Sequence, residues 1–176
     1  MSANTDPHAL NEQGKQAFQS GDLPSAVDSF RAAAESFAAA GDDLNAAESR
    51  NNLSVALLQS GKPQDSLDAT LGTGEVFAKA GDLKRQGMAL GNQAAALEAL
   101  KRFDEALTAY EQSASVLGEA SEGDLRAMVL KSAAALKLKR GRVNESFFKM
   151  IGSLEAKQNP SVFDRILRTL VRFVQR

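Results

Sequence analysis

The sequence contains no cysteine and only one histidine. The absence of cysteine excludes disulfides, thiolate nucleophiles and zinc–thiolate sites. The single histidine, His8, stands near the start of the chain, where we expect a solvated side chain. Histidines, aspartates and glutamates do not cluster at the spacing that metal ligands require, so the sequence predicts no bound metal.

Long apolar runs are missing as well. No stretch of the chain approaches the roughly 20 apolar residues that a membrane-spanning helix needs. Residues 1–16 lack the basic start and the apolar core of a secretory signal. These absences predict a cytoplasmic protein.

Motifs for nucleotide binding and catalysis are incomplete. A dinucleotide-binding fingerprint would need a glycine where Phe77 stands, and a phosphate loop would need one at Ala56. Adjacent carboxylates at 42–43 and 104–105 fall at expected helix starts, where they complement the helix dipole. The sequence therefore predicts no catalytic site and no cofactor, which indicates a protein that is not an enzyme.

Charge is distributed unevenly along the chain. The formal net charge is −1. Residues 1–124 hold 9 Lys and Arg against 19 Asp and Glu, a net charge of −10. Residues 125–176 hold 12 and 3 of these, a net charge of +9. An acidic body and a basic end of this kind influence which partners the protein meets.

A repeat with a period of 40 residues runs through most of the chain. Four similar segments begin after tight breaks, which are centred on Gly21, Gly61, Lys101 and Gly141. Five positions after each break stands a small residue: Ala26, Ser66, Ala106 and Ser146. A fixed period of this size is typical of repeat architectures.

Helical patterns fill the rest of each repeat. Ala-rich stretches with apolar residues three and four positions apart precede the later breaks, over 45–60, 84–100 and 126–140. Between repeats the chain reads Gly-Asp at 41–42, 81–82 and 123–124, where Gly suits a helix end and Asp the next N-cap. Strand-like alternation is not evident. The sequence predicts an all-α fold of four helical hairpins and one further helix.

Within the second repeat, Gly72 and Gly74 interrupt the expected second helix. Each costs about 1 kcal/mol relative to alanine inside a helix. We therefore expect either close helix packing or a kink at this point.

The repeat resembles the tetratricopeptide repeat (TPR). The residues that carry the resemblance in the first unit are Leu10, Gly14, Ala17, Ala26, Phe30 and Ala33, and those in the third are Leu90, Ala94, Leu97, Ala106 and Tyr110. The 40-residue period is similar to that of long-helix adaptors such as kinesin light chain and the LGN-type polarity proteins. The resemblance implies a right-handed α-solenoid with a TPR domain over 1–159, in units of about 6–40, 42–80, 82–120 and 124–158. HEAT and armadillo repeats share a similar period.

In the TPR family, a concave groove lined by the first helix of each unit binds a peptide or helix of a partner. The resemblance places the following residues on that groove: Asn11, Lys15, Glu48, Asn51, Asn52, Val55, Met88, Asn92, Ala95, Met128, Lys131 and Leu138. Asn52 and Asn92 occupy the same position in successive units. The resemblance implies that they hold a ligand backbone, whereas the alternative is two exposed polar side chains.

The last segment, 160–176, has a strong amphipathic pattern. On a helical projection, arginines lie opposite an apolar stripe that includes Phe163, Ile166, Leu167, Leu170, Phe173 and Val174. Such a helix suits three roles: capping the last repeat, self-association, or docking on a membrane surface. The basic end lacks interleaved aromatic residues, so nucleic acid is not an expected partner.

Two functions remain open from the sequence. The first is an adaptor or scaffold that binds a protein partner in the groove. The second is a structural protein that assembles with itself, or attaches to a membrane surface, through 160–176.

Overall fold

The structure is a computed structural model that describes residues 6–156, with side chains described for residues 6–141. Within this range the chain forms eight α-helices and no strand, which confirms the all-α prediction. The helices are α1 (Pro7–Ser20), α2 (Leu23–Ala39), α3 (Asp43–Gln59), α4 (Pro63–Thr70), α5 (Thr73–Lys79), α6 (Leu83–Ala99), α7 (Phe103–Glu119) and α8 (Gly123–Ala156). The chain divides into two compact units, residues 1–134 and residues 135–176.

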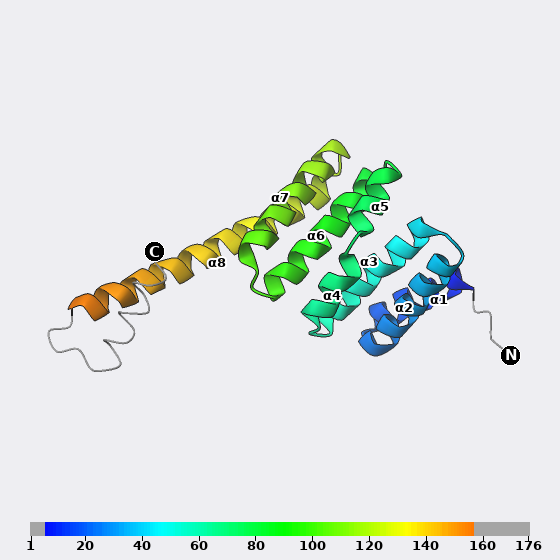
Figure 1. Cartoon of the computed structure of the whole chain (residues 1–176), viewed down its shortest axis with the longest axis horizontal. Coiled ribbons are helices and arrows are strands. Elements are labelled where there is room, and N and C mark those ends of the chain that lie inside the picture. The colour runs from blue at the N-terminus through cyan, green and yellow to red at the C-terminus, as the bar shows by residue number, and fades with distance from the viewer. Residues whose placement is uncertain (1–5, 157–176) are drawn as a thin grey trace. The chain divides into compact units, whose positions relative to one another are not determined.

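Helices of the first unit pack beside their neighbours in the chain (Figure 1). Helix α1 packs on α2, α2 on α3, and α6 on α7, through loops of two or three residues. Helix α6 also contacts α3, α4 and α5. The helical hairpins expected over 6–40 and 82–120 are therefore present.

The predicted breaks and caps explain where these helices end. Gly21, Gly61 and Lys101 all adopt left-handed backbone angles, with φ of 82°, 73° and 62°. Such angles end a helix and favour glycine. The carboxylates of Asp42 and Asp82 accept the backbone N–H three residues later, at 3.1 and 2.9 Å, as N-caps do.

Two predicted boundaries differ from the structure. The third Gly-Asp pair does not form a break, because α8 begins at Gly123 and the left-handed residue is Ser121, with φ of 58°. The break expected at Gly141 is also absent, since α8 continues to Ala156. Gly141 is followed by neither proline nor an Asp cap, and the arginines beside it favour a continuous helix.

Of the two alternatives expected at Gly72 and Gly74, close packing or a kink, the structure shows an interruption of the helix at Gly72. Helix α4 ends at Thr70, α5 begins at Thr73, and Gly72 between them has φ of 78°. The Arg50 guanidinium from α3 donates to the carbonyls of Asp68 and Leu71, at 3.3 and 2.8 Å. This contact gives the Leu71 carbonyl a partner and adds a second donor to the Asp68 carbonyl, which also accepts from the backbone N–H of Leu71 at 3.3 Å.

A weaker packing residue in the second repeat accompanies this break. Thr70 occupies the position that Phe30 and Tyr110 occupy in the neighbouring repeats. All three side chains are buried, but the threonine offers less apolar surface. Its hydroxyl instead donates to the carbonyl of Leu67, at 2.7 Å. The second repeat thus gives its second helix less packing to hold it straight.

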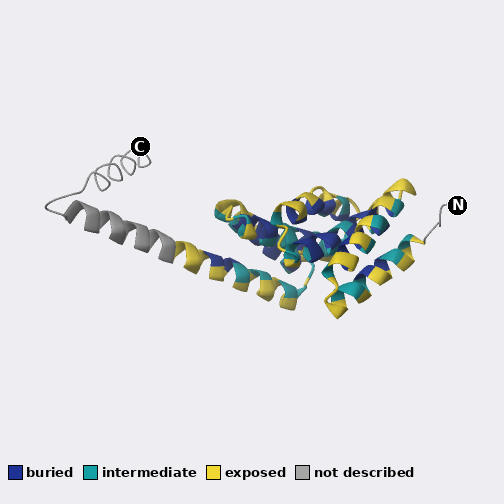
Figure 2. Cartoon of the chain, turned by 90° about the horizontal axis from the view of Figure 1, so that it is seen from below, coloured by how far each residue is buried: buried dark blue, intermediate teal, exposed yellow. Residues whose placement is uncertain are grey.

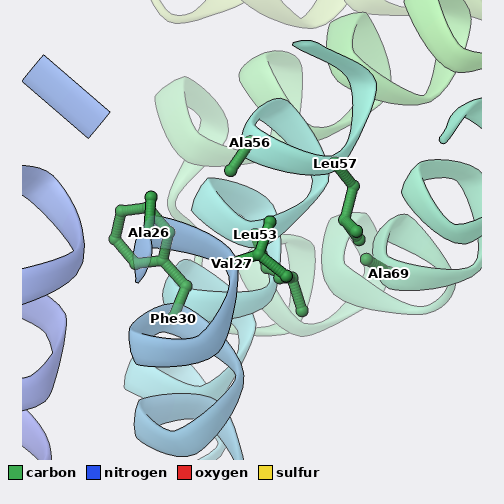
Figure 3. Packing of buried hydrophobic residues seen from close by; sticks show 7 residues of the cluster. All are labelled: Ala26, Val27, Phe30, Leu53, Ala56, Leu57 and Ala69. Atoms are coloured by element: carbon green, nitrogen blue, oxygen red, sulfur yellow. The ribbon is translucent and has the colours of Figure 1, made fainter. Parts of the chain in front are cut away.

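The buried core lies between the packed helices of the first unit (Figure 2). One cluster joins α2, α3 and α4 through seven buried side chains: Ala26, Val27, Phe30, Leu53, Ala56, Leu57 and Ala69 (Figure 3). Small residues permit this approach. A Cβ added to Gly14 of α1 would lie 2.6 Å from Cδ1 of Phe30, closer than carbon atoms pack.

The repeat gives a matched test of backbone strain at two equivalent positions. Lys101 adopts a left-handed angle that glycine takes at Gly61. We expect Lys101→Gly to raise the free energy of unfolding by about 0.5–1 kcal/mol and Gly61→Lys to lower it by about 1 kcal/mol. Urea unfolding followed by circular dichroism measures both. If both substitutions changed the free energy of unfolding in the same direction, the left-handed conformation of these two residues would be contradicted.

Candidate functional site

A hollow lies among α6, α7 and the start of α8, and we call it the α6–α8 cavity. Its volume is about 430 Å³. Its lining is Met88, Gly91, Asn92, Ala95, Tyr110, Leu117, Leu125, Met128, Val129, Lys131 and Ser132. All of these residues belong to the first compact unit. Five of the twelve predicted groove residues therefore meet in one cavity.

Most polar groups of this cavity already have partners inside the protein. The Asn92 amide donates to Oδ1 of Asn51, at 2.8 Å. The Tyr110 hydroxyl donates to a carboxylate oxygen of Glu98, at 3.1 Å, and the Ser132 hydroxyl donates to a backbone carbonyl, at 3.3 Å. The cavity therefore offers an occupant mainly apolar surface.

Tyr110 has a strongly shifted acidity. Burial, followed by the nearby Glu98 carboxylate, raises its pKa to about 12. The neutral phenol is therefore favoured in the folded state, and its contribution to stability is complete below the unfolded pKa of about 10. We expect this contribution to be lost as the pH rises from about 10 to about 12.

The composition makes this titration simple to observe. The chain has one tyrosine and no tryptophan. Ultraviolet absorbance of the phenolate thus reports on Tyr110 alone. A midpoint near 10 in the folded protein would contradict the buried, Glu98-bonded environment, and the urea-unfolded chain provides the control with an ordinary midpoint.

A smaller cavity of about 160 Å³ lies among α1, α2 and α3. Its lining is Lys15, Phe18, Gln19, Phe30, Asn52 and Val55. Three predicted groove residues, Lys15, Asn52 and Val55, thus meet in this cavity. Lys15 forms an ion pair with Glu12, at 2.7 Å, while the Asn52 side chain makes no hydrogen bond within the described residues. Asn52 and Asn92 therefore lie in different cavities.

Two other predicted groove residues are buried. Asn11 is 9% exposed and accepts a hydrogen bond from the Ser49 hydroxyl, at 3.4 Å. Asn51 is 6% exposed and accepts from Asn92. Both asparagines thus join first helices of successive repeats to one another, and they present little surface to a partner.

Glu48, also predicted on the groove, belongs to an ionic contact between α3 and α6. Its carboxylate lies 2.9 Å from Nη1 of Arg85, which also contacts Asp82 at 2.6 Å. The backbone N–H and the guanidinium of Arg85 lower the pKa of Asp82. Arg85 further lies 5.1 Å from the ring centre of Phe77. This arrangement ties the second and third repeats together.

The asparagine pair predicts a difference in stability between two similar substitutions. Asn92→Ala leaves the buried Oδ1 of Asn51 without its donor, which should cost about 1–2 kcal/mol. Asn52→Ala removes no hydrogen bond and should change stability by less than about 0.5 kcal/mol. Thermal unfolding of both variants measures the difference. Equal losses would contradict the proposed role of the Asn51–Asn92 bond.

The remaining predictions fall elsewhere. Leu138 lies on α8 in the second compact unit. The C-terminal interface residues, Phe163, Ile166, Leu167, Leu170, Phe173 and Val174, lie outside the described residues. Sequence reasoning missed Tyr110 and Leu117, which line the α6–α8 cavity from α7. Tyr110 entered the sequence-based prediction only as a residue of the repeat pattern, and Leu117 did not enter it.

The acidic side chains that could support chemistry serve the helices instead. The paired carboxylates lie at helix starts as predicted, with Asp42 capping α3 and Asp104 and Glu105 in the first turn of α7. No group of three or more His, Asp or Glu side chains in the described part is placed to hold a metal ion. None of the helices within residues 6–156 combines the length and apolar character needed to cross a membrane.

Comparison with solved structures identifies a similar fold. The crystal structure of BtubC (BKLC) from P. vanneervenii matches with a TM-score of 0.57 and 13% sequence identity. The match covers 79% of this chain and 67% of that chain. At this identity the likeness concerns the fold alone. No protein-family model and no curated protein sequence matches this chain.

Proposed function

We propose that this chain is an adaptor of the TPR type, which binds a peptide or helix of a partner protein in a groove lined by the first helices of its repeats. The α6–α8 cavity carries the proposal. It brings together Met88, Asn92, Ala95, Met128 and Lys131, which the resemblance assigned to the groove from the sequence. A cavity of about 430 Å³ is of the size that binding pockets have.

Several observations support a right-handed solenoid of TPR units. The chain has a 40-residue period, packed helical hairpins and completely buried small residues at equivalent positions, such as Ala26 and Ala106. The fold-level similarity to BtubC is compatible with this arrangement. The proposal includes the sequence-based expectations of a cytoplasmic protein that is not an enzyme.

The engaged polar groups define how a partner would be held. Because Asn92 donates to Asn51 within the protein, the cavity offers Met88 of α6 and Met128 of α8 more freely than this amide. Met88 is 38% exposed and Met128 is 66% exposed. Methionine adapts its shape to different apolar partners. The proposed contact is therefore an apolar anchor of the partner, with Asn52 free to bond its backbone.

Affinity capture with matched variants tests this proposal. The bait is the full chain, beside a Met88→Glu/Met128→Glu variant and a Leu71→Glu control. Leu71 is 53% exposed and lies outside the cavity, at the break between α4 and α5. We expect a partner held by the native chain and the control to be lost by the double variant, with circular dichroism unchanged. Equal recovery by all three would overturn the proposal.

A further inference from the structure

The α6–α8 cavity sets clear requirements for its occupant. Its apolar lining includes two exposed methionines, Met88 and Met128. The Asn92 amide and the Tyr110 hydroxyl are already bonded within the protein. Lys131 is the one charged residue among the described residues of the lining. A ligand that depended on many hydrogen bonds would find few further polar groups there. An amphipathic helix that inserts large apolar side chains meets these requirements.

The sequence of this chain contains such a helix pattern outside the described residues. Projected as a helix, residues 160–176 place their large apolar side chains on one side: Val162, Phe163, Ile166, Leu167, Leu170, Val171, Phe173 and Val174. Four arginines lie on the opposite side. An apolar stripe of this width needs a protein or membrane surface to cover it.

Opposite net charges favour association of residues 160–176 with the first unit of a second copy. Residues 160–176 contain four Arg and one Asp, a net charge of +3, whereas residues 1–134, the unit that holds the cavity, carry −8. Opposite charges of this size increase the rate of encounter between two molecules, and salt screens the attraction. With the apolar stripe in the cavity, the arginines on the other side of the helix do not enter the apolar lining.

We propose that residues 160–176 of a second copy of this chain bind in the α6–α8 cavity. This inference rests on the proposed function, because it takes the groove as a binding site and names its occupant. Each chain carries one cavity and one segment, so the contact is head-to-tail. Repetition of a head-to-tail contact adds further copies until a ring closes or a filament grows.

Complementary variants of the full chain test the inference. The cavity variant is Met88→Glu/Met128→Glu, and the segment variant is Leu167→Glu/Leu170→Glu. Sedimentation equilibrium over a range of concentrations gives the mass of each protein. The native chain should associate, and each double substitution should weaken association at least about a hundredfold. The Leu71→Glu control should associate as the native chain does.

Mixing the two variants gives the sharpest result. The cavity variant keeps an intact segment, and the segment variant keeps an intact cavity. An equal mixture should therefore form dimers, and no larger species, because each pair has one working contact. Raising the salt from about 0.05 M to about 0.5 M should weaken association of the native chain.

Other outcomes overturn the inference. A native chain that stays monomeric contradicts it, as does a cavity variant that associates normally, since segments would then pair with each other. A mixture that stays monomeric also contradicts it. A monomeric native chain that still captures a partner through Met88 and Met128 would leave the proposed function standing. Self-association through the cavity without any captured partner would instead remove the adaptor role.

Discussion

We expect the Phe77→Ala variant to lose about 3–5 kcal/mol of its free energy of unfolding. Phe77 on α5 is completely buried and packs with Ala47 of α3 and Ala89 of α6. These alanines are too small to collapse into the space that the ring would leave. The substitution also removes the contact between the Phe77 ring and the Arg85 guanidinium, which lies 5.1 Å from the ring centre.

Urea unfolding followed by circular dichroism measures this loss. Phe77→Leu is the matched control, because it keeps most of the buried volume and should cost less than about 1.5 kcal/mol. A loss below about 1.5 kcal/mol for Phe77→Ala would contradict the packing of α5 against α3 and α6.

The second large effect is a difference between two glycine substitutions. A Cβ on Gly87 of α6 would lie 2.6 Å from Cγ of Leu117, which is completely buried on α7. A hydrogen bond from the Ser113 hydroxyl to the Gly87 carbonyl, at 2.7 Å, holds the two helices at this separation. Gly87→Ala should therefore destabilise the fold by about 1–3 kcal/mol, despite the better helix propensity of alanine.

Gly74→Ala provides the control of opposite sign. A Cβ on Gly74 of α5 would meet only Leu90, at 3.9 Å, an ordinary contact distance. Alanine at this position should stabilise the protein by about 0.5–1 kcal/mol. The two variants should thus differ by about 1.5–4 kcal/mol in chemical unfolding. Similar stabilities would contradict the close approach of α6 and α7.

Much of the helix arrangement could be predicted because its signals are local. Breaks at Gly21, Gly61 and Lys101 recur at a fixed interval, and the capping role of Asp82 needs only its own loop. The kink at Gly72 also follows from a local cost, that of glycine in a helix. Local signals of this kind survive folding because each acts within one turn of the chain.

The boundaries that were wrong lack such a signal. At Gly141 the period alone predicted a break, but no proline or capping aspartate follows it. The chain therefore continues as α8 through this residue. A glycine ends a helix when the residues beside it also favour a helix end, as a following proline or capping aspartate does. The 40-residue period carries no information about those residues.

The sequence could predict several of the residues that line the candidate site, but not which contacts they form. The resemblance brought Met88 and Met128 to the groove, and the structure places them in one cavity. The bond between Asn92 and Asn51 could not be predicted, because it depends on the distance between α3 and α6. A side chain whose repeat position predicts contact with a ligand can thus form a hydrogen bond within the protein instead.

Site-specific photo-crosslinking at Met128 can establish whether the α6–α8 cavity binds a protein segment. A benzoylphenylalanine placed at Met128, 66% exposed on the rim of the cavity, is compared with one at Leu71, 53% exposed outside it. Both full-length proteins are irradiated under native conditions, and the adducts are identified by mass spectrometry. We expect a defined adduct at position 128 that is absent at position 71, either with a partner protein or with residues 160–176 of a second copy. The same adducts at both positions, or none at position 128, would show that this cavity is not a binding site.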